Sequence, residues 1–171
     1  MINARYIKLG EQGCYAETCI IGSRTIKEGD CIRLGYKTPD NPIIHDRCIH
    51  GNDDDWESVR EYWRDVRLRD GAKPQTVDRT ARNDIRQIRD FYKCDIDTVW
   101  FTFFRGLLWW CNVAPDVELL DDHTRIRKTI NGWRCDGGNQ EPLKIETLDG
   151  RLTQLAAYQG TICTPSHHEV G

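Results

Sequence analysis

One stretch constrains this chain more than any other, a basic amphipathic helix that leads into an aromatic hairpin between Thr80 and Asn112. Apolar residues recur at the spacing of one helix face: Val77, Ala81, Ile85, Ile88 and Tyr92. Arginines occupy the other faces. Two segments rich in aromatic and β-branched residues follow, Thr98 to Phe104 and Leu107 to Val113. They predict two strands that are joined by a turn at Arg105-Gly106.

The hairpin has two faces with different side chains. With a two-residue turn at Arg105-Gly106, Thr102 lies opposite Trp109 and Trp100 lies opposite Cys111. Trp100 and Trp109 then share one face. The reverse face is uniformly apolar: Phe101, Phe103, Leu108 and Trp110. We expect this reverse face in the core, and Trp100 and Trp109 as the walls of a pocket. The alternative is that the core covers one face and helices cover the other.

Length and composition describe one folded soluble domain. The chain has 171 residues, of which 39% are hydrophobic and 30% charged, and it has six Trp. We expect one domain over residues 1–163 and a flexible tail or truncation point over 164–171. A net charge of -3 argues against a protein that binds nucleic acid indiscriminately through a uniform coat of Lys and Arg. A local basic face remains compatible with that total.

The cysteines favour a reducing compartment. Eight Cys are spread along the chain without a C-x-x-C pair, and no secretory leader precedes the first polar strand. We therefore expect reduced thiols, a cytoplasmic location, and neither a metal nor another cofactor. No apolar run has the length of a membrane span, so we expect no membrane partner.

Short strands and several helices alternate along the rest of the chain. Strands are predicted over Ala4–Leu9, Cys31–Tyr36 and Arg125–Ile130, with a turn from Asn131 to Arg134. The predicted helices are residues 43–49, a helix capped by Asp54 or Asp55, residues 75–92, and residues 148–158. This order predicts an α+β domain with a small, strongly curved or closed sheet and three to four flanking helices.

Ala81-Arg82-Asn83-Asp84, on a helix that leads to an aromatic strand, resembles the Ala-Arg-Asn segment of EVE domains in the PUA-like superfamily. YTH and ASCH domains are relatives. Lys93-Cys94-Asp95 stands where that family has a Gly-Asp turn. The resemblance covers residues 77 to 112. It implies a curved β-barrel whose aromatic pocket takes in a flipped, chemically modified base, as in the reading domains of restriction-type systems, and it implies a nuclease or motor effector on another domain or chain.

A base pocket needs flat walls, hydrogen-bonding groups for the base edge and a basic rim for phosphates. The predicted base-pocket residues are Tyr15, Tyr36, Asn83, Asp84, Trp100, Trp109 and Trp133. The predicted phosphate-binding residues are Arg82, Arg86, Arg125, Arg127, Lys128 and Arg134. Each has a structural alternative. The aromatics can fill the core or close the barrel end, the charges can face solvent, and Asn83 and Asp84 can belong to an ordinary helix.

The leading functional hypothesis is a binding module rather than an enzyme. It recognises a modified base by flipping it into an aromatic pocket. Modified cytosine in DNA is the favoured ligand, and RNA is the close variant. A His- and Asp-based nuclease or hydrolase is the first alternative, with these candidates: His45, His50, His123, Asp46, Asp53 and Asp122. They lack the spacing of a recognised catalytic motif. A protein-interaction domain with exposed aromatics is the second alternative.

Overall fold

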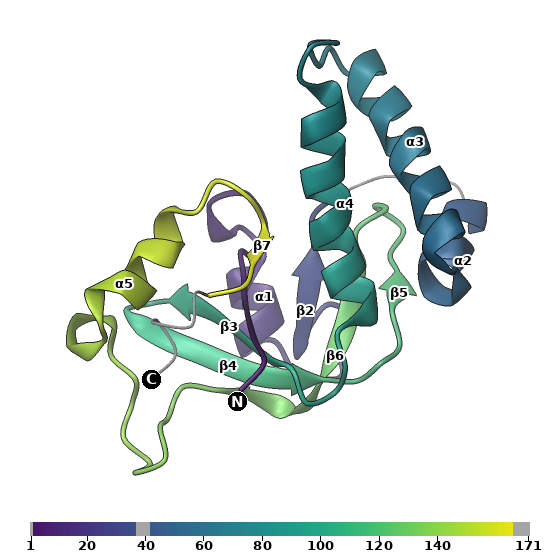
Figure 1. Cartoon of the computed structure of the whole chain (residues 1–171). Coiled ribbons are helices and arrows are strands. Elements are labelled where there is room, and N and C mark those ends of the chain that lie inside the picture. Colours follow the sequence, from purple (N-terminus) through teal and green to yellow (C-terminus); the bar gives the residue numbers. More distant parts are fainter. Residues whose placement is uncertain (1, 37–41, 166–171) are drawn as a thin grey trace.

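A curled mixed sheet forms the centre of the protein (Figure 1). The structure is a computed structural model and describes residues 2–36 and 42–165. Within these residues the strands follow the order β2-β6-β4-β3-β1-β7, and β5 pairs with β6. Their bounds are β1 (Ala4–Ile7), β2 (Cys31–Leu34), β3 (Val99–Phe104), β4 (Leu107–Val113), β5 (Glu118–Leu119), β6 (Arg125–Arg134) and β7 (Ile162–Cys163). The predicted α+β class with a curved sheet is confirmed.

The β3–β4 hairpin has the predicted register. Thr102 pairs with Trp109 and Trp100 with Cys111, because a two-residue turn forms at Arg105-Gly106 with both residues in the left-handed region (φ 49° and 75°). On the other edge of β3, β1 runs parallel to it. The hairpin therefore lies inside the sheet, between β1 and β6.

Strand β6 is longer than predicted. Asn131 and Gly132 have left-handed backbones (φ 65° and 79°), which explains the turn signal in the sequence. The strand nevertheless continues to Arg134, and its pairing with β4 shifts register between Trp110 and Asn112. The predicted turn is wrong, because the irregularity is absorbed as a bulge rather than ending the strand.

The helices are α1 (Ala16–Ile21), α2 (Pro42–His50), α3 (Asp53–Arg69), α4 (Val77–Lys93) and α5 (Gly150–Thr153), with 3₁₀ turns η1 (Glu11–Gly13), η2 (Ile145–Thr147) and η3 (Gln154–Ala157). The described part of the chain thus has five α-helices, more than the expected three to four. Asn52, rather than Asp54 or Asp55, is the N-cap of α3, and Asp55 completes a capping box with it. The helix predicted over 148–158 forms in two pieces, α5 and η3.

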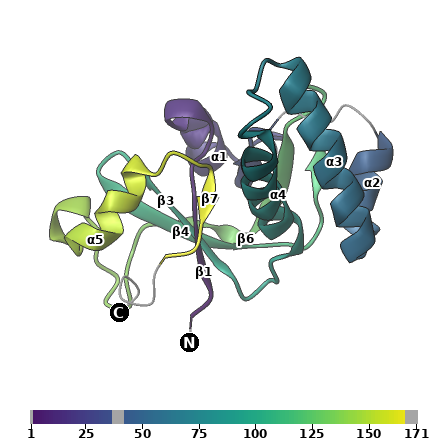
Figure 2. The ribbon, with the colours of Figure 1, turned by 45° about the horizontal axis from the view of Figure 1, so that its top comes forward.

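Helices α3 and α4 form an antiparallel hairpin that stands up from one side of the sheet (Figure 1). Helix α5 and turn η3 lie on the other side, and α1 and β7 lie between the two groups (Figure 2). Trp56, Val59, Trp63 and Val66 are the buried residues of α3, as their helical spacing predicts. This arrangement leaves the outer face of α4 open to solvent next to the central strands.

Both faces of the β3–β4 hairpin are covered. Trp100 and Cys111 belong to the main core, which the α3–α4 hairpin and β2 help to build. Phe101 and Leu108 belong to a second, smaller cluster with Tyr6 of β1, and residues of α5 and η3 pack against it. The alternative stated for the hairpin, with both faces buried, is therefore the observed one. The predicted assignment of the Trp100 face to an open pocket is wrong.

Candidate nucleic-acid interface

Two of the predicted pocket walls are core residues. Trp100 is fully buried, with its ring centroid 6.3 Å from that of Phe91 in a T-shaped contact. Trp133 is 9% exposed, and its indole N–H donates to the carbonyl of Cys31 at 3.0 Å. A base could stack on Trp100 only if the main core opened. The assignment of both residues to a base pocket is corrected, since burial of an indole accounts for them without a ligand.

Trp109 and Tyr15 are half-buried and lie against the main core. The indole N–H of Trp109 donates to the carbonyl of Phe104 at 3.1 Å, within its own hairpin. Tyr15 packs against the backbone of Gly10, and the guanidinium of Arg33 lies 4.0 Å from its ring centroid. Each ring therefore already has an intramolecular partner.

Asp84 is a buried carboxylate that joins α4 to α3. It accepts hydrogen bonds from the indole of Trp63 (2.8 Å), from Nε and Nη2 of Arg67 (3.0 and 2.6 Å), and from the hydroxyl of Tyr36 (3.3 Å). With its acceptors in use, Asp84 cannot read a base edge without breaking this cluster, and its predicted role is corrected. Burial and Asp84 raise the pKa of Tyr36 to about 12, so that its hydroxyl stays a donor. Asn83 is exposed instead, and its carbonyl accepts from Arg86 at 3.0 Å.

Arg125 and Arg127 are each 1% exposed, so their predicted contacts with phosphates are corrected. Arg127 donates to the carbonyls of Phe91, Cys94 and Ala114 at 2.9 to 3.0 Å. It thereby ties the carboxyl end of α4 to β6. Ile126, between the two arginines, is also 1% exposed, so both faces of this part of β6 are covered and neither arginine reaches solvent.

Lys128 and Arg134 have local partners. The ammonium of Lys128 donates to the carbonyls of Gly29 (2.7 Å) and Ile26 (3.1 Å) and so holds the loop before β2. Arg134 pairs with Asp136 at 2.9 Å and lies over the ring of Trp110. Of the predicted phosphate-binding residues, Arg82 and Arg86 are the two exposed on the outer face of α4.

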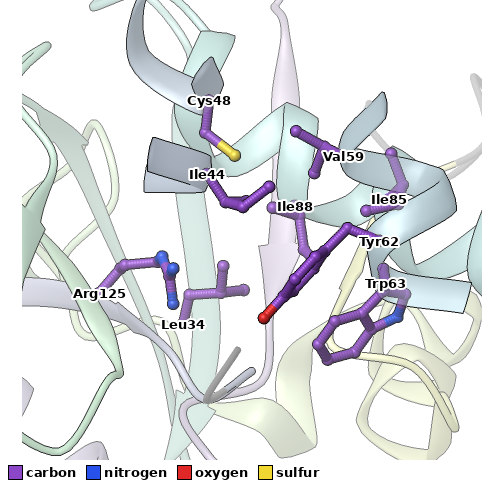
Figure 3. A pocket seen from close by; sticks show the side chains of 9 residues that line it. All are labelled: Leu34, Ile44, Cys48, Val59, Tyr62, Trp63, Ile85, Ile88 and Arg125. Carbon is purple, nitrogen blue, oxygen red and sulfur yellow. The ribbon is translucent and has the colours of Figure 1, made fainter. Parts of the chain in front are cut away.

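A narrow crevice with a volume of only about 10 Å³ lies between α2, α3 and α4 and the sheet (Figure 3). Its lining is largely apolar, with Ile44, Ile88 and Leu34 close to the guanidinium of Arg125. That guanidinium donates to the hydroxyl of Tyr92 (2.6 Å) and to the carbonyl of His123 (2.7 Å). The crevice is an imperfectly packed part of the core, since it is too small for a ligand and the polar groups of Arg125 and Trp63 already have protein partners.

A larger hollow of about 260 Å³, partly open to solvent, lies between β1, β3, the start of α1 and η3. It is lined by Tyr6, Lys8, Leu9, Gln12, Gly13, Ala16, Thr102, Phe103 and Ala156. Tyr6 and Phe103 bring aromatic rings whose centroids are 5.9 Å apart. Burial raises the pKa of Tyr6 to about 12, and Cys163 adds to the shift, so Tyr6 remains a neutral phenol.

The rim of this hollow has an unusual backbone. Gln12 adopts a left-handed conformation (φ 54°), between Gly10 (φ 83°) and Gly13 (φ 73°). A Cβ at Gly10 would lie 2.5 Å from Sγ of Cys14 and 2.6 Å from the ring of Tyr15, so only glycine fits there. A left-handed residue other than Gly, Asn or Asp costs about 1 kcal/mol or more and is often found at functional sites.

Sequence reasoning missed this hollow. Tyr6 and Lys8 alternate on the first predicted strand, and Gly10-x-x-Gly13 follows directly, which is a signal for a special loop. Phe103 and Thr102, however, come from a hairpin nearly a hundred residues later, and Ala156 from a short turn near the end. Their meeting depends on the parallel pairing of β1 with β3, which local sequence patterns do not specify.

The His and Asp residues of the enzyme hypothesis have separate partners. His50 pairs with Asp46 on the exposed side of α2, and His45 contacts the hydroxyl of Tyr92 at 2.7 Å. Asp122 pairs with Arg33. Within residues 2–36 and 42–165, no group of three or more His, Cys, Asp or Glu is placed to hold a metal ion. None of the described helices is both long and apolar enough to cross a membrane.

Comparisons of this chain with protein-family models, with curated proteins and with solved structures yield no match. The fold and the chemistry of the hollow are therefore the basis for a functional proposal.

Proposed function

We propose that this protein is a nucleic-acid-binding module that takes an extruded, modified base into the hollow between β1, β3, α1 and η3. The observation that carries the proposal is the hollow itself, with two aromatic rings, polar residues at its lining and a left-handed Gln12 at its rim. Its volume of about 260 Å³ lies just below the range of small-ligand pockets, which is about 300–1,000 Å³. Modified cytosine in DNA is the leading ligand, and RNA is the close variant.

The lining suits a flipped base. The half-buried ring of Phe103 offers apolar aromatic surface for stacking, and the buried ring of Tyr6 packs behind it. Gln12 has both a donor and an acceptor for a base edge. Lys8 supplies a cation whose Nζ already donates to the carbonyl of Tyr158 at 2.5 Å, and the remaining protons of this ammonium are available to a ligand or to water. A neutral Tyr6 phenol adds no negative charge that would repel a phosphate.

The test is binding to a matched panel of duplexes that carry plain, 5-methyl-, 5-hydroxymethyl- or glucosylated cytosine at one site, together with the corresponding plain and methylated RNA. We expect at least one modified substrate to bind more tightly than its plain counterpart. Fluorescence anisotropy measures the affinities. Equal affinity for every member of the panel contradicts the modified-base proposal, and cleavage of a duplex by the protein alone favours the nuclease hypothesis.

Gln12→Ala localises the site. We expect it to weaken binding to the preferred substrate about tenfold, a loss typical of hydrogen bonds to a base edge, which are worth about 1–3 kcal/mol. The matched control is Gln140→Ala, because Gln140 is also an exposed glutamine with a left-handed backbone (φ 63°) and does not line the hollow. Equal affinities of the two variants would place the base elsewhere.

A further inference from the structure

Three arginines on the outer face of α4 differ from the other basic residues of the helical hairpin. Along the sides of the hairpin, arginines pair with carboxylates: Arg64 with Asp78, Arg67 with Asp84, and Arg89 with Asp53. Arg79, Arg82 and Arg86 are exposed, and none of the three forms an ion pair with a carboxylate in the described part of the chain. The chain has 27 acidic residues, so this face is a local exception to its acidic total.

The carboxylate that most nearly opposes this face is already in use. Glu57 of α3 forms an ion pair with Arg60, which lowers the pKa of Glu57, and Arg82 adds a smaller effect of the same sign. Arg86 donates to the side-chain carbonyl of Asn83 at 3.0 Å, which leaves its positive charge uncompensated. The outer face of α4 is therefore a row of positive charge that an anionic partner would complement.

The spacing of the row suits a nucleic-acid strand. Residues 79 and 86 are seven positions apart, which is about 10 Å along a helix axis. Phosphates follow one another at about 3.4 Å per strand along the axis of a duplex. The three arginines therefore span a length that holds about three successive phosphates of one strand.

The row also leads to the hollow. The positive charge of Arg86 acts on the Tyr158 hydroxyl and opposes the rise in its pKa that burial causes. The carbonyl of Tyr158 accepts from Lys8, which lines the hollow. Strand β7 lies beside α4 at the same place, because the side-chain carbonyl of Gln87 accepts from the backbone N–H of Thr161 and Ile162, each at 2.7 Å. Tyr158 thus connects Lys8 of the hollow with Arg86 of α4.

We propose that the outer face of α4 binds the phosphates on one side of the extruded nucleotide, so that the footprint on the nucleic acid is one-sided. The position of the nucleotide rests on the proposed function, whereas the phosphate contacts do not. A strand with its base in the hollow reaches Arg86 first, then Arg82 and Arg79. Flanking nucleotides on that side contribute to affinity, and those on the other side contribute little.

The salt dependence of binding tests the contacts. The full-length triple variant Arg79→Gln, Arg82→Gln, Arg86→Gln is compared with wild type on a plain 24-base-pair duplex, with the fold checked by circular dichroism. Each lost phosphate contact reduces the slope of log K against log salt concentration by about 0.9, so we expect a slope smaller by about 2.7. The control triple variant Lys27→Gln, Arg105→Gln, Arg151→Gln removes three charges that are paired with surface carboxylates, and it should keep the wild-type slope.

A second measurement tests the one-sided footprint. Duplexes carry the tightest-binding cytosine of the panel, or 5-methylcytosine if all bind equally, three base pairs from either the left or the right end. Wild type should bind one of the two at least tenfold more tightly, and the α4 triple variant should bind both alike.

The two measurements separate the two proposals. If the protein prefers a modified base but the two triple variants have equal salt slopes, phosphate binding by α4 is contradicted and the reading of a modified base stands. If the α4 variant has the smaller slope but the protein prefers no base, phosphate binding by α4 stands and the reading of a modified base is contradicted. Equal binding of polyglutamate and DNA would assign the face to an acidic protein and overturn the proposal.

Discussion

At the scale of single residues, burial separates side chains that the sequence presents as equals. Asp78 and Asp84 both lie on α4 and both pair with an arginine of α3, at 2.6 Å in each case. The Asp78 side chain is 60% exposed, whereas that of Asp84 is 7% exposed and also accepts from Trp63. Solvent screens the first pair, and the second is part of the core. The two carboxylates therefore differ in their contribution to stability.

We expect Asp84→Ala to lower the free energy of unfolding by about 3–5 kcal/mol, because it leaves Arg67 and the Trp63 N–H in or near the core without their acceptor. Asp78→Ala is the matched control and should cost less than about 1 kcal/mol. Urea unfolding followed by tryptophan fluorescence measures both. Equal losses would show that Asp84 does not act as a buried acceptor.

At the scale of elements, a polar contact that depends on pH joins α2 to α4 of the α3–α4 hairpin. Nδ1 of His45 lies 2.7 Å from the hydroxyl of Tyr92, and that hydroxyl also accepts from Nε of Arg125. Burial is the larger cause that lowers the pKa of His45, and the neighbouring charge of Arg125 adds to it, while Asp46 opposes both. The folded protein therefore favours the neutral imidazole, and α2 packs best when His45 is uncharged.

This preference predicts the sign of the pH dependence. The unfolded state, in which His45 has a pKa of about 6.5, binds the proton more readily than the folded state. The contribution of His45 to stability is therefore complete above about pH 6.5 and is lost as the pH falls below that value. Urea unfolding between pH 5 and 8 should show a smaller loss at low pH for His45→Gln than for wild type. His50→Gln, which changes an exposed histidine on the same helix, should behave as wild type.

At the scale of the whole molecule, buried polar side chains hold the helical layer on the sheet. Arg127 of β6 donates to the last carbonyls of α4, and Gln87 of α4 accepts from the backbone of β7. These contacts fix the angle at which the α3–α4 hairpin stands above the sheet (Figure 1). The relation between the two proposed binding surfaces, the hollow and the arginines of α4, therefore depends on groups that touch neither ligand.

We expect Arg127→Met to destabilise the protein by about 3 kcal/mol, because three carbonyls lose a buried donor that methionine cannot replace. Its neighbour Lys128→Met, at a half-buried position of the same strand, should cost less than about 1 kcal/mol. Thermal unfolding measures the difference. At temperatures where both variants are folded, the slope of log K against log salt concentration for DNA binding should equal that of wild type. A smaller slope for Arg127→Met would show that Arg127 contacts a phosphate after all.

The sequence by itself determined the local features of this protein. Helical spacing identified the buried face of α4, and aromatic and β-branched residues with a short turn identified the β3–β4 hairpin and its register. These features depend on neighbours within a few positions, where periodicity is informative. The resemblance to EVE domains and the reading of a modified base were also inferred at this level, and they stay predictions.

Only the tertiary structure decided which surfaces are buried. The sequence predicted Trp100 as a pocket wall and Arg127 as a phosphate contact, yet the curled sheet and the α3–α4 hairpin enclose both side chains. The hollow forms because β1 pairs in parallel with β3, which brings Lys8 and Gln12 to Phe103 across a long separation in the chain. Helix α4 begins two residues later and ends one residue later than the predicted range of 75–92, and Arg82 and Arg86 are exposed on it. Its position over the sheet comes from long-range contacts that no local pattern encodes.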